Sequence, residues 1–307
     1  MKHLIIILII LIATALYSCQ YQQPLYIEYA EGERRPVEII FDWNDCPDAA
    51  PKSMSLYLFP LDGSHYTRHE FNNRSGGKIL ITPGLYAAVA LNSDNEQINV
   101  LNEGHSDDFR LMIRNANSLS SASFHREESE QICPAPEPLW TAWIPEVRIS
   151  DNKLVVKMCE AFCRYTVDVH RITNPEIVSS VRAIISGNNS AMSFDGPDQN
   201  AKSVSLLFNF DPLVGDSVTG RLLTLGHCGL GRSRVSDDQP HNLTLEFTLG
   251  DGSMRSTSVD VTNQIHSQPT ERCHIVIDSI TVPINGSGGM NLTVEEWQTI
   301  NIAIGAN

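Results

Sequence analysis

The sequence lacks the residue patterns that usually mark catalytic and nucleotide-binding sites. It contains no His-Glu-x-x-His pair of metal ligands and no Gly-x-Ser-x-Gly elbow for a serine nucleophile. The Gly-rich stretch 226–231 does not have the glycine order of a dinucleotide fingerprint, and no strand–helix–strand unit surrounds it. These absences disfavour an enzyme and favour a protein whose role is binding or assembly.

Positive charge and aromatic residues are also scarce. The chain has 22 lysines and arginines against 36 aspartates and glutamates, which gives a formal net charge of −14. Such a surface repels polyanions, so we expect neither nucleic acid nor anionic lipid as a main partner. Aromatic residues make up only 7% of the chain, and Trp140 and Trp143 lie beside a predicted joint between domains. Burial at that joint explains these tryptophans more simply than a surface on which sugars stack.

A long apolar run occurs only at the N-terminus. A short positive start is followed by the almost wholly apolar stretch 4–15, and then by Leu16-Tyr17-Ser18-Cys19, which has the form of a bacterial lipobox. The pattern predicts a signal peptide over residues 1–18 and a mature chain that begins at a lipidated Cys19. An uncleaved membrane helix would need about 20 apolar residues, and polar residues follow too soon. Two or three acyl chains would hold the mature protein stably on a membrane.

Cysteine is too infrequent for a disulfide scaffold in a chain of this length. Apart from Cys19, the cysteines are Cys46, Cys133, Cys159, Cys163, Cys228 and Cys273. In an exported protein these permit three disulfides, with 15 pairings among which the sequence cannot choose, and buried free thiols are the alternative. The last four could hold zinc as thiolates, but a disulfide is more common than zinc in an exported protein.

Short stretches with a period of two residues dominate the chain after residue 36. The ranges 37–41, 53–60 and 78–82 alternate between the two faces of a strand. The range 85–91 is almost continuously apolar, which predicts a central strand. Further along, Gly250-Asp251-Gly252-Ser253 predicts a hairpin turn. Short strands with turns every 8–12 residues are typical of a sandwich or barrel.

A Pro-rich stretch divides the chain into two halves with the same β pattern. Cys133-Pro134-Ala135-Pro136-Glu137-Pro138 cannot continue a strand ladder, so we place the domain boundary there. The sequence therefore predicts an all-β protein with a tether over residues 19–36, one β-sandwich over 37–136 and a second over 137–307. A short helix is expected to begin at Pro175.

The remaining candidate sites rest on short patterns. His65 and His69 are four residues apart, but this spacing brings ligands together on a helix and not on a strand. Asp94, Glu96 and the loop 195–198 carry oxygen ligands of the kind that bind calcium. Solvated surface is the simpler explanation for these groups, and we predict no cofactor.

Several motifs occur in an order that resembles a known family. After the lipobox come Asp42-Trp43, Met54-Ser55-Leu56-Tyr57-Leu58-Phe59-Pro60, Pro83-Gly84-Leu85-Tyr86-Ala87-Ala88-Val89-Ala90-Leu91-Asn92, Cys163-Arg164-Tyr165-Thr166-Val167, Leu249-Gly250-Asp251-Gly252, Asp260-Val261-Thr262-Asn263-Gln264-Ile265-His266, His274-Ile275-Val276-Ile277-Asp278 and Glu296-Trp297. The chain resembles the Bacteroidetes lipoproteins of unassigned function that are similar to fimbrillin-associated pilus anchor proteins.

The resemblance implies a fold, a location and a role. The implied fold is two tandem transthyretin-like or immunoglobulin-like β-sandwich domains, and the implied location is the outer membrane, through a lipid on Cys19. The implied role is in fimbriae or adhesion, without catalytic residues. Gln20-Tyr21-Gln22-Gln23 lacks the acidic residues that often follow the lipidated cysteine in surface-exposed lipoproteins of this phylum. Whether the domains face outward or toward the periplasm therefore stays open.

The sequence is compatible with two functions. The first is an anchor or accessory subunit of a fimbrium, which binds other subunits by β-strand addition. The second is a surface lipoprotein that binds glycans or proteins. Arg34-Arg35 precedes the first predicted strand and suits a trypsin-like protease, but Pro36 blocks cleavage after Arg35, though not between the two arginines. We therefore expect an anchor that keeps its N-terminal segment rather than a shaft subunit that loses it.

Overall fold

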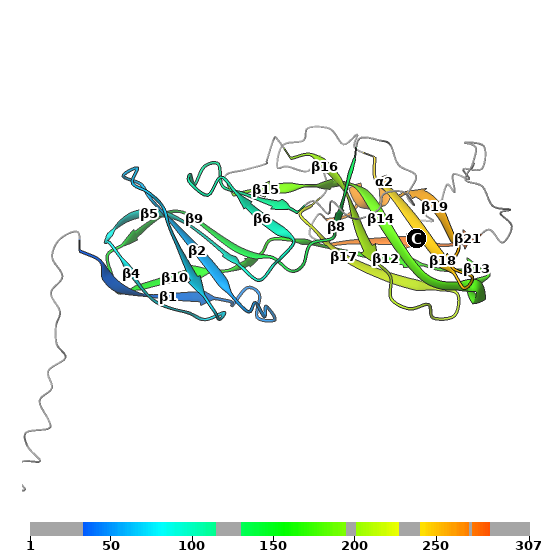
Figure 1. The fold of residues 1–307 in the computed structure, drawn as a ribbon, viewed down its shortest axis with the longest axis horizontal. Helices are drawn as coiled ribbons and strands as arrows, with labels where there is room; N and C mark the ends of the chain where they lie inside the picture. Colours follow the sequence, from blue (N-terminus) through cyan, green and yellow to red (C-terminus); the bar gives the residue numbers. More distant parts are fainter. Residues whose placement is uncertain (1–32, 115–129, 195–200, 227–239, 270–271, 283–307) are drawn as a thin grey trace, which may run out of the picture.

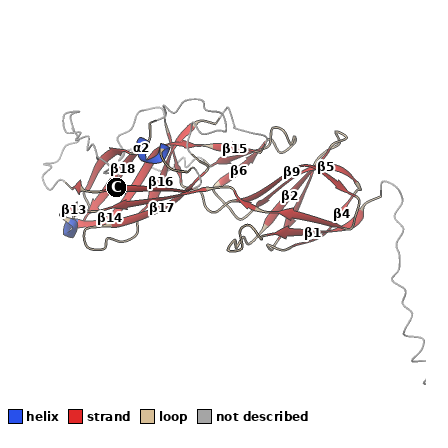
Figure 2. Cartoon of the chain, turned by 180° about the vertical axis from the view of Figure 1, so that it is seen from behind, coloured by secondary structure: helices blue, strands red, loops and turns tan. Residues whose placement is uncertain are grey.

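The computed structural model describes residues 33–114, 130–194, 201–226, 240–269 and 272–282. Strands make up most of these residues, as Figures 1 and 2 show, which confirms the prediction of an all-β chain. Helical structure in the described ranges is limited to the 3-10 turn η2 (Pro175–Ile177) and the short helix α2 (Thr262–His266). Neither has the length that crossing a bilayer requires.

The N-terminal group of strands forms two facing sheets. The first has the order β10-β1-β4 and the second has the order β11-β9-β5-β2-β3. Their bounds are Lys153–Lys157 (β10), Arg35–Asp42 (β1), Gly76–Ile81 (β4), Cys159–Glu160 (β11), Trp140–Ile149 (β9), Gly84–Asn92 (β5), Met54–Pro60 (β2) and Thr67–Phe71 (β3). β5 lies in the middle of its sheet, between β9 and β2, as the apolar run 85–91 predicts.

Alternation along β1 determines which side chains enter the core between these sheets. Val37, Ile39 and Phe41 are buried, whereas Glu38 between them is exposed. They pack with Leu56 and residues of similar size from the facing sheet in one apolar cluster. Burial of each such side chain stabilises the fold by about 1.5–3 kcal/mol.

A small third sheet covers the opposite face of β2 and β5. It has the order β15-β7-β6, with bounds Ala191–Ser193 (β15), Arg110–Ile113 (β7) and Ile98–Leu101 (β6). Tyr57 and Val89 point away from the first core, and they belong to a second cluster that includes Phe109 and Leu111. The Tyr57 and Phe109 rings meet edge to face, with centroids 4.9 Å apart. β2 and β5 are therefore apolar on both faces because each face has its own cover.

The C-terminal group of strands forms a second pair of sheets and a short ladder. Their orders are β17-β12-β20, β19-β18-β14-β16-β8 and β13-β21. Their bounds are Val218–Thr224 (β17), Cys163–Val169 (β12), Arg272–Ile277 (β20), Met254–Asp260 (β19), Asn242–Leu249 (β18), Val178–Asn189 (β14), Ser203–Asn209 (β16), Gln131–Pro134 (β8), Ile172–Thr173 (β13) and Ile280–Thr281 (β21). β18 and β19 pair antiparallel on either side of residues 250–253, which confirms the predicted hairpin.

Strand pairing does not follow the expected division at residues 136 and 137. β8, before that point, pairs with β16 of the C-terminal group. β9 and β10, after it, pair with β5 and β1 of the N-terminal group. The Pro-rich stretch is thus a crossing between the groups, because prolines end the β8 ladder without fixing which sheet the next strand joins. The division of the chain into two sandwich domains stays a prediction.

A bulge in β14 depends on a glycine and a carboxylate. Gly187 has a φ of +79°, and a Cβ built there would lie 2.4 Å from the Nδ1 atom of the buried His241 ring. The Gly187 N–H donates to a carboxylate oxygen of Glu130 at 3.1 Å, and the same carboxylate accepts from the hydroxyls of Ser203 and Ser205. The bulge and the start of β16 are therefore held by one acidic side chain.

We predict that Leu111→Ala lowers the free energy of unfolding by about 2–5 kcal/mol, because it leaves a cavity where the third sheet covers β2 and β5. Leu111 is fully buried. The measurement is urea denaturation followed by tryptophan fluorescence. Leu80→Ala is the control, since Leu80 is 58% exposed and its truncation should cost less than about 0.5 kcal/mol. Equal losses in the two variants would contradict the arrangement.

We also predict that Gly187→Ala destabilises the protein by more than about 2 kcal/mol, because the new methyl group meets both positive-φ strain and the His241 ring. Gly252→Ala is the matched control. Gly252 has a φ of +82° with nothing within 4 Å of the added Cβ, so only the backbone term of about 1 kcal/mol should remain. Thermal denaturation of both variants measures the difference.

Candidate functional site

Several residues singled out from the sequence lie outside the described residues. They are Cys19, Cys228, the loop 195–198 and the motif Glu296-Trp297. The lipidation of Cys19 therefore stays a prediction. Asp94 is described, and its carboxylate accepts hydrogen bonds from the Lys52 N–H at 2.7 Å and the Asn92 side-chain amide at 2.8 Å. It thus fixes the loop after β5.

The five described cysteines form no disulfide with one another and lie in distinct environments. Cys159 is exposed on β11, whereas Cys163 is half-buried on β12, in a different sheet. Burial raises the pKa of Cys133 and of Cys273 to about 11, which keeps both thiols protonated and unreactive at neutral pH. In the described ranges no three His, Cys, Asp or Glu side chains come together as a metal site would require.

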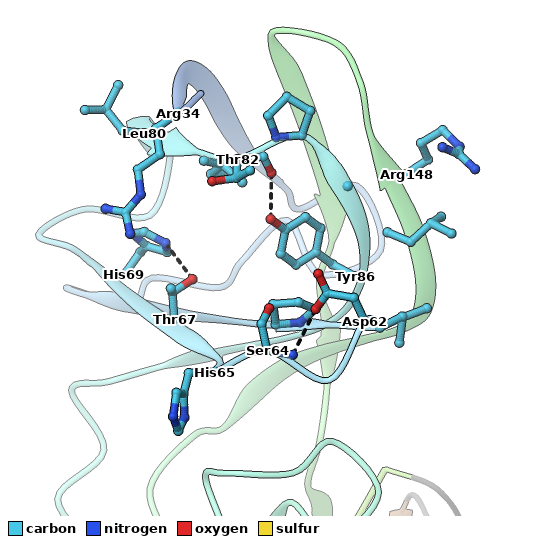
Figure 3. A pocket seen from close by; sticks show the side chains of 16 residues that line it. Arg34, Asp62, Ser64, His65, Thr67, His69, Leu80, Thr82, Tyr86 and Arg148 are labelled. Carbon is cyan, nitrogen blue, oxygen red and sulfur yellow. Dashed lines mark hydrogen bonds between the residues drawn. The ribbon is translucent and has the colours of Figure 1, made fainter. Parts of the chain in front are cut away.

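A pocket of about 580 Å³ opens at the end of the N-terminal sheets where β1 begins (Figure 3). It lies between the edge strands β3 and β4 and the first residues of β5. Its lining residues are Arg34, Pro60, Leu61, Asp62, Ser64, His65, Thr67, His69, Leu80, Ile81, Thr82, Pro83, Gly84, Leu85, Tyr86 and Arg148. Fourteen of these sixteen residues lie between Pro60 and Tyr86, and sheet pairing adds Arg34 and Arg148 from distant segments.

Hydrogen bonds fix the walls of this pocket. The Tyr86 hydroxyl donates to the Thr82 carbonyl at 2.6 Å, and an Asp62 carboxylate oxygen accepts from the Ser64 N–H at 2.9 Å. The His69 Nε2 atom lies 3.2 Å from the Thr67 hydroxyl. Figure 3 shows Arg34 extending over the pocket toward His69, while Arg148 lies at the opposite rim.

Burial and charge set the protonation of these groups. Burial lowers the pKa of His69, and the neighbouring Arg34 guanidinium lowers it further, so the imidazole is neutral at pH 7. Hydrogen bonds from Ser64 lower the pKa of Asp62, which is a carboxylate at that pH. Burial raises the pKa of Tyr86. The pocket therefore combines a guanidinium and a neutral imidazole with one carboxylate, and its Tyr86 hydroxyl is already used within the wall.

The two histidines with four-residue spacing lie at the pocket, which their spacing alone does not predict. His65 and His69 line the same pocket, although the four-residue spacing has no helical meaning on a β background. Arg34, Tyr86 and Arg148 carry no sequence signal that links them to these histidines. Only the antiparallel pairing of β5 with β9 and of β1 with β4 brings their segments to one end of the sheets.

The Arg34-Arg35 pair stands at the same end. β1 begins at Arg35, whose guanidinium donates to the Ser150 carbonyl. β1 then pairs parallel with β10 on one side and antiparallel with β4 on the other. Cleavage between Arg34 and Arg35 would leave β1 in the sheet, so it would open no groove at that position.

β19 is an edge strand of the five-stranded C-terminal sheet. It pairs with β18 from Met254 to Asp260, and no described strand pairs with its other side. β3 is also an edge strand, but its exposed side chains Arg68 and Glu70 form an ion pair, and charge on an edge discourages strand addition. β19 carries its charges near its two ends, at Arg255 and Asp260, and the uncharged stretch 256–259 between them suits a partner strand better than β3 does.

Comparison with known proteins places the chain in a family. A family model described as "Domain of unknown function (DUF5119)" matches residues 18–209. A curated protein of Bacteroides ovatus, named "Putative fimbrium anchoring subunit Fim4B", is 24% identical over 122 residues, which are 40% of this chain and 35% of that protein. The match thus spans about a third of the relative's length.

One solved structure supports the fold with a TM-score above 0.5. A crystal structure titled as a "putative adhesin" from Bacteroides ovatus superposes with a TM-score of 0.57 at 19% identity, covering 81% of this chain and 94% of that one. The match to "The fimbrial anchor protein Mfa2 from Porphyromonas gingivalis" covers 79% of this chain and 90% of that one, at 18% identity and a TM-score of 0.46. Because the family model matches more than half of the length of this chain, the chain belongs to the family described as "Domain of unknown function (DUF5119)".

Proposed function

We propose that this protein is a lipid-anchored subunit of the cell envelope that anchors a fimbrium or serves it as an accessory subunit. The matched relative is named "Putative fimbrium anchoring subunit Fim4B", and a structure titled "putative adhesin" has a similar fold. The observation that carries the proposal is the position of β1. It follows the tether directly and is held by strands on both sides.

The position of β1 suits an anchor better than a shaft subunit. In a shaft subunit, loss of an N-terminal segment opens a groove for a partner's strand. Here the bond between Arg34 and Arg35 lies directly at the start of β1, so cleavage there would remove the tether and leave the sheet complete. Such a subunit would keep its tether, because the tether is the proposed link to the outer membrane through Cys19.

Partner subunits are proposed to bind by β-strand addition at β19. This strand has seven residues and a free outer side among the described strands. Main-chain hydrogen bonds would supply most of the contact, so little side-chain chemistry is needed. The two sandwich domains of the proposal would then present β19 at the end of the molecule away from the tether (Figure 1).

The alternative of a glycan-binding lipoprotein has less support. Trp140 and Trp143 are both half-buried. The Trp140 ring meets those of Trp43 and Phe162 edge to face, and Trp143 packs on Phe194. These tryptophans pack inward and do not form a flat exposed row on which sugars stack. The proposed role is assembly without catalysis.

We predict that Cys19→Ala abolishes membrane attachment, because it removes the acyl chains that hold the mature protein. Wild-type protein should incorporate labelled palmitate and sediment with outer membranes, and the variant should do neither. Cys159→Ala is the matched control, since Cys159 is the exposed cysteine of the described part and should not affect attachment. A wild type without label, with the variant still on membranes, would contradict the anchor.

We also predict that the protein purified from native membranes carries fimbrial subunits and begins at an acylated Cys19. The reason is that β1 needs no processing at Arg34-Arg35 to complete its sheet. Affinity purification followed by mass spectrometry of partners and of the N-terminal peptide tests both parts. A mature N-terminus at Arg35 would indicate a shaft subunit. A bound glycan with no protein partner would support the binding-module alternative.

A further inference from the structure

The arginines of the pocket differ from most others in the chain. In the described ranges, Arg34, Arg148 and Arg272 have neither a side-chain hydrogen bond nor an ion pair, and the first two line the same pocket. By contrast, Arg164 and Arg221 each bind a carboxylate at 2.8 Å and 2.6 Å. Two guanidinium groups with unused donors therefore stand around one cavity.

The pocket holds little negative charge to offset them. Asp62 is its one carboxylate, and that group already accepts hydrogen bonds from Ser64. The local excess of positive charge contrasts with the net charge of −14 for the whole chain. An anion is thus favoured at this position, although the rest of the surface repels anions.

The rim of the pocket is apolar. Leu61 is 47% exposed and Leu80 is 58% exposed, and both belong to the small set of large hydrophobic side chains left exposed in the described part of the chain. A free inorganic anion gains nothing from such a rim. A ligand with an anionic group and an apolar body would use both features.

The pocket also lies at the end of the protein to which the proposed membrane tether is attached. It opens beside the start of β1, at one end of the elongated molecule (Figure 1). Arg34 follows Cys19 by fifteen positions in the sequence, so an extended tether would reach about 50 Å at most. A protein held through Cys19 would keep this end within that distance of the lipid headgroups, so the pocket could reach them.

We propose that this pocket binds the phosphate group of a membrane amphiphile, with Arg34 as its main contact. Planar guanidinium groups pair well with phosphate oxygens, and Leu61 and Leu80 cover the adjoining apolar part. The proposal rests on the proposed lipid anchor for its orientation toward the membrane. Arg34 extends toward His69 over the pocket, whereas the Arg148 guanidinium is directed outward at the far rim (Figure 3). Arg148 therefore contributes less.

The test uses the full mature chain with Cys19→Ala, so that no attached lipid interferes. Isothermal titration calorimetry compares three probes below their micelle concentrations: dihexanoyl phosphatidic acid, inorganic phosphate and octyl glucoside. We expect phosphatidic acid to bind at least about tenfold more tightly than inorganic phosphate, and octyl glucoside to bind least. Arg34→Gln should weaken phosphatidic acid about tenfold or more, since a charge-assisted contact is lost.

Two further variants calibrate that loss. Arg148→Gln should have a smaller effect than Arg34→Gln. Arg272→Gln should have none, because Arg272 is also unpaired but lies on β20, away from the pocket. Unchanged circular dichroism spectra and melting temperatures would show that each variant is folded.

Other outcomes would overturn the proposal. Equal affinity for inorganic phosphate and phosphatidic acid would assign the pocket to a free phosphate ligand. Equal affinity for octyl glucoside would make it an apolar or sugar site. Absence of binding, or binding that Arg34→Gln leaves unchanged, would remove the site altogether. Because the tested chain carries no lipid, each of these results is independent of whether Cys19 is acylated.

Discussion

The burial of β2 and β5 on both faces is the constraint on which the structure depends. One face of these strands packs on β1, β4 and β10, and the other is covered by the sheet of β6, β7 and β15. β15 follows directly after β14 of the C-terminal group. The cover of the N-terminal strands is therefore completed by a strand from the other group, and the second apolar cluster runs through both. The two groups share a core as well as a connecting chain.

Local sequence patterns predict much of the strand content but not the pairing. The alternation of Val37, Ile39 and Phe41, the apolar run 85–91 and the turn 250–253 each specify a strand or turn that the structure contains. A period of two residues fixes which face of a strand is buried, and it carries no information about the neighbouring strand. β8 and β9 are separated by a few residues, yet β8 pairs with β16 and β9 pairs with β5. These partners are distant in sequence, so no local pattern around β8 and β9 indicates which group each strand joins.

The pocket could not be predicted for a related reason. His65 and His69 are close in sequence, so their spacing can be seen there, but only the folded structure shows that both line one pocket. Arg34 precedes β1, Tyr86 lies on β5 and Arg148 lies on β9. The segment 60–86 supplies most of the lining, but the two arginines come from distant segments, so the positive excess exists only after the sheets assemble in a chain that is acidic overall.

The position of β1 also determines how a proposed anchor would bear load. Tension from the tether would enter at Arg35 and act along the strand axis. β1 has five paired positions with β10 and six with β4, so many ladder hydrogen bonds resist sliding together. A strand at a sheet edge and pulled sideways would lose its bonds one at a time. The two-sided pairing of the first strand would therefore let the N-terminal sheet of the proposed anchor resist a pull along β1.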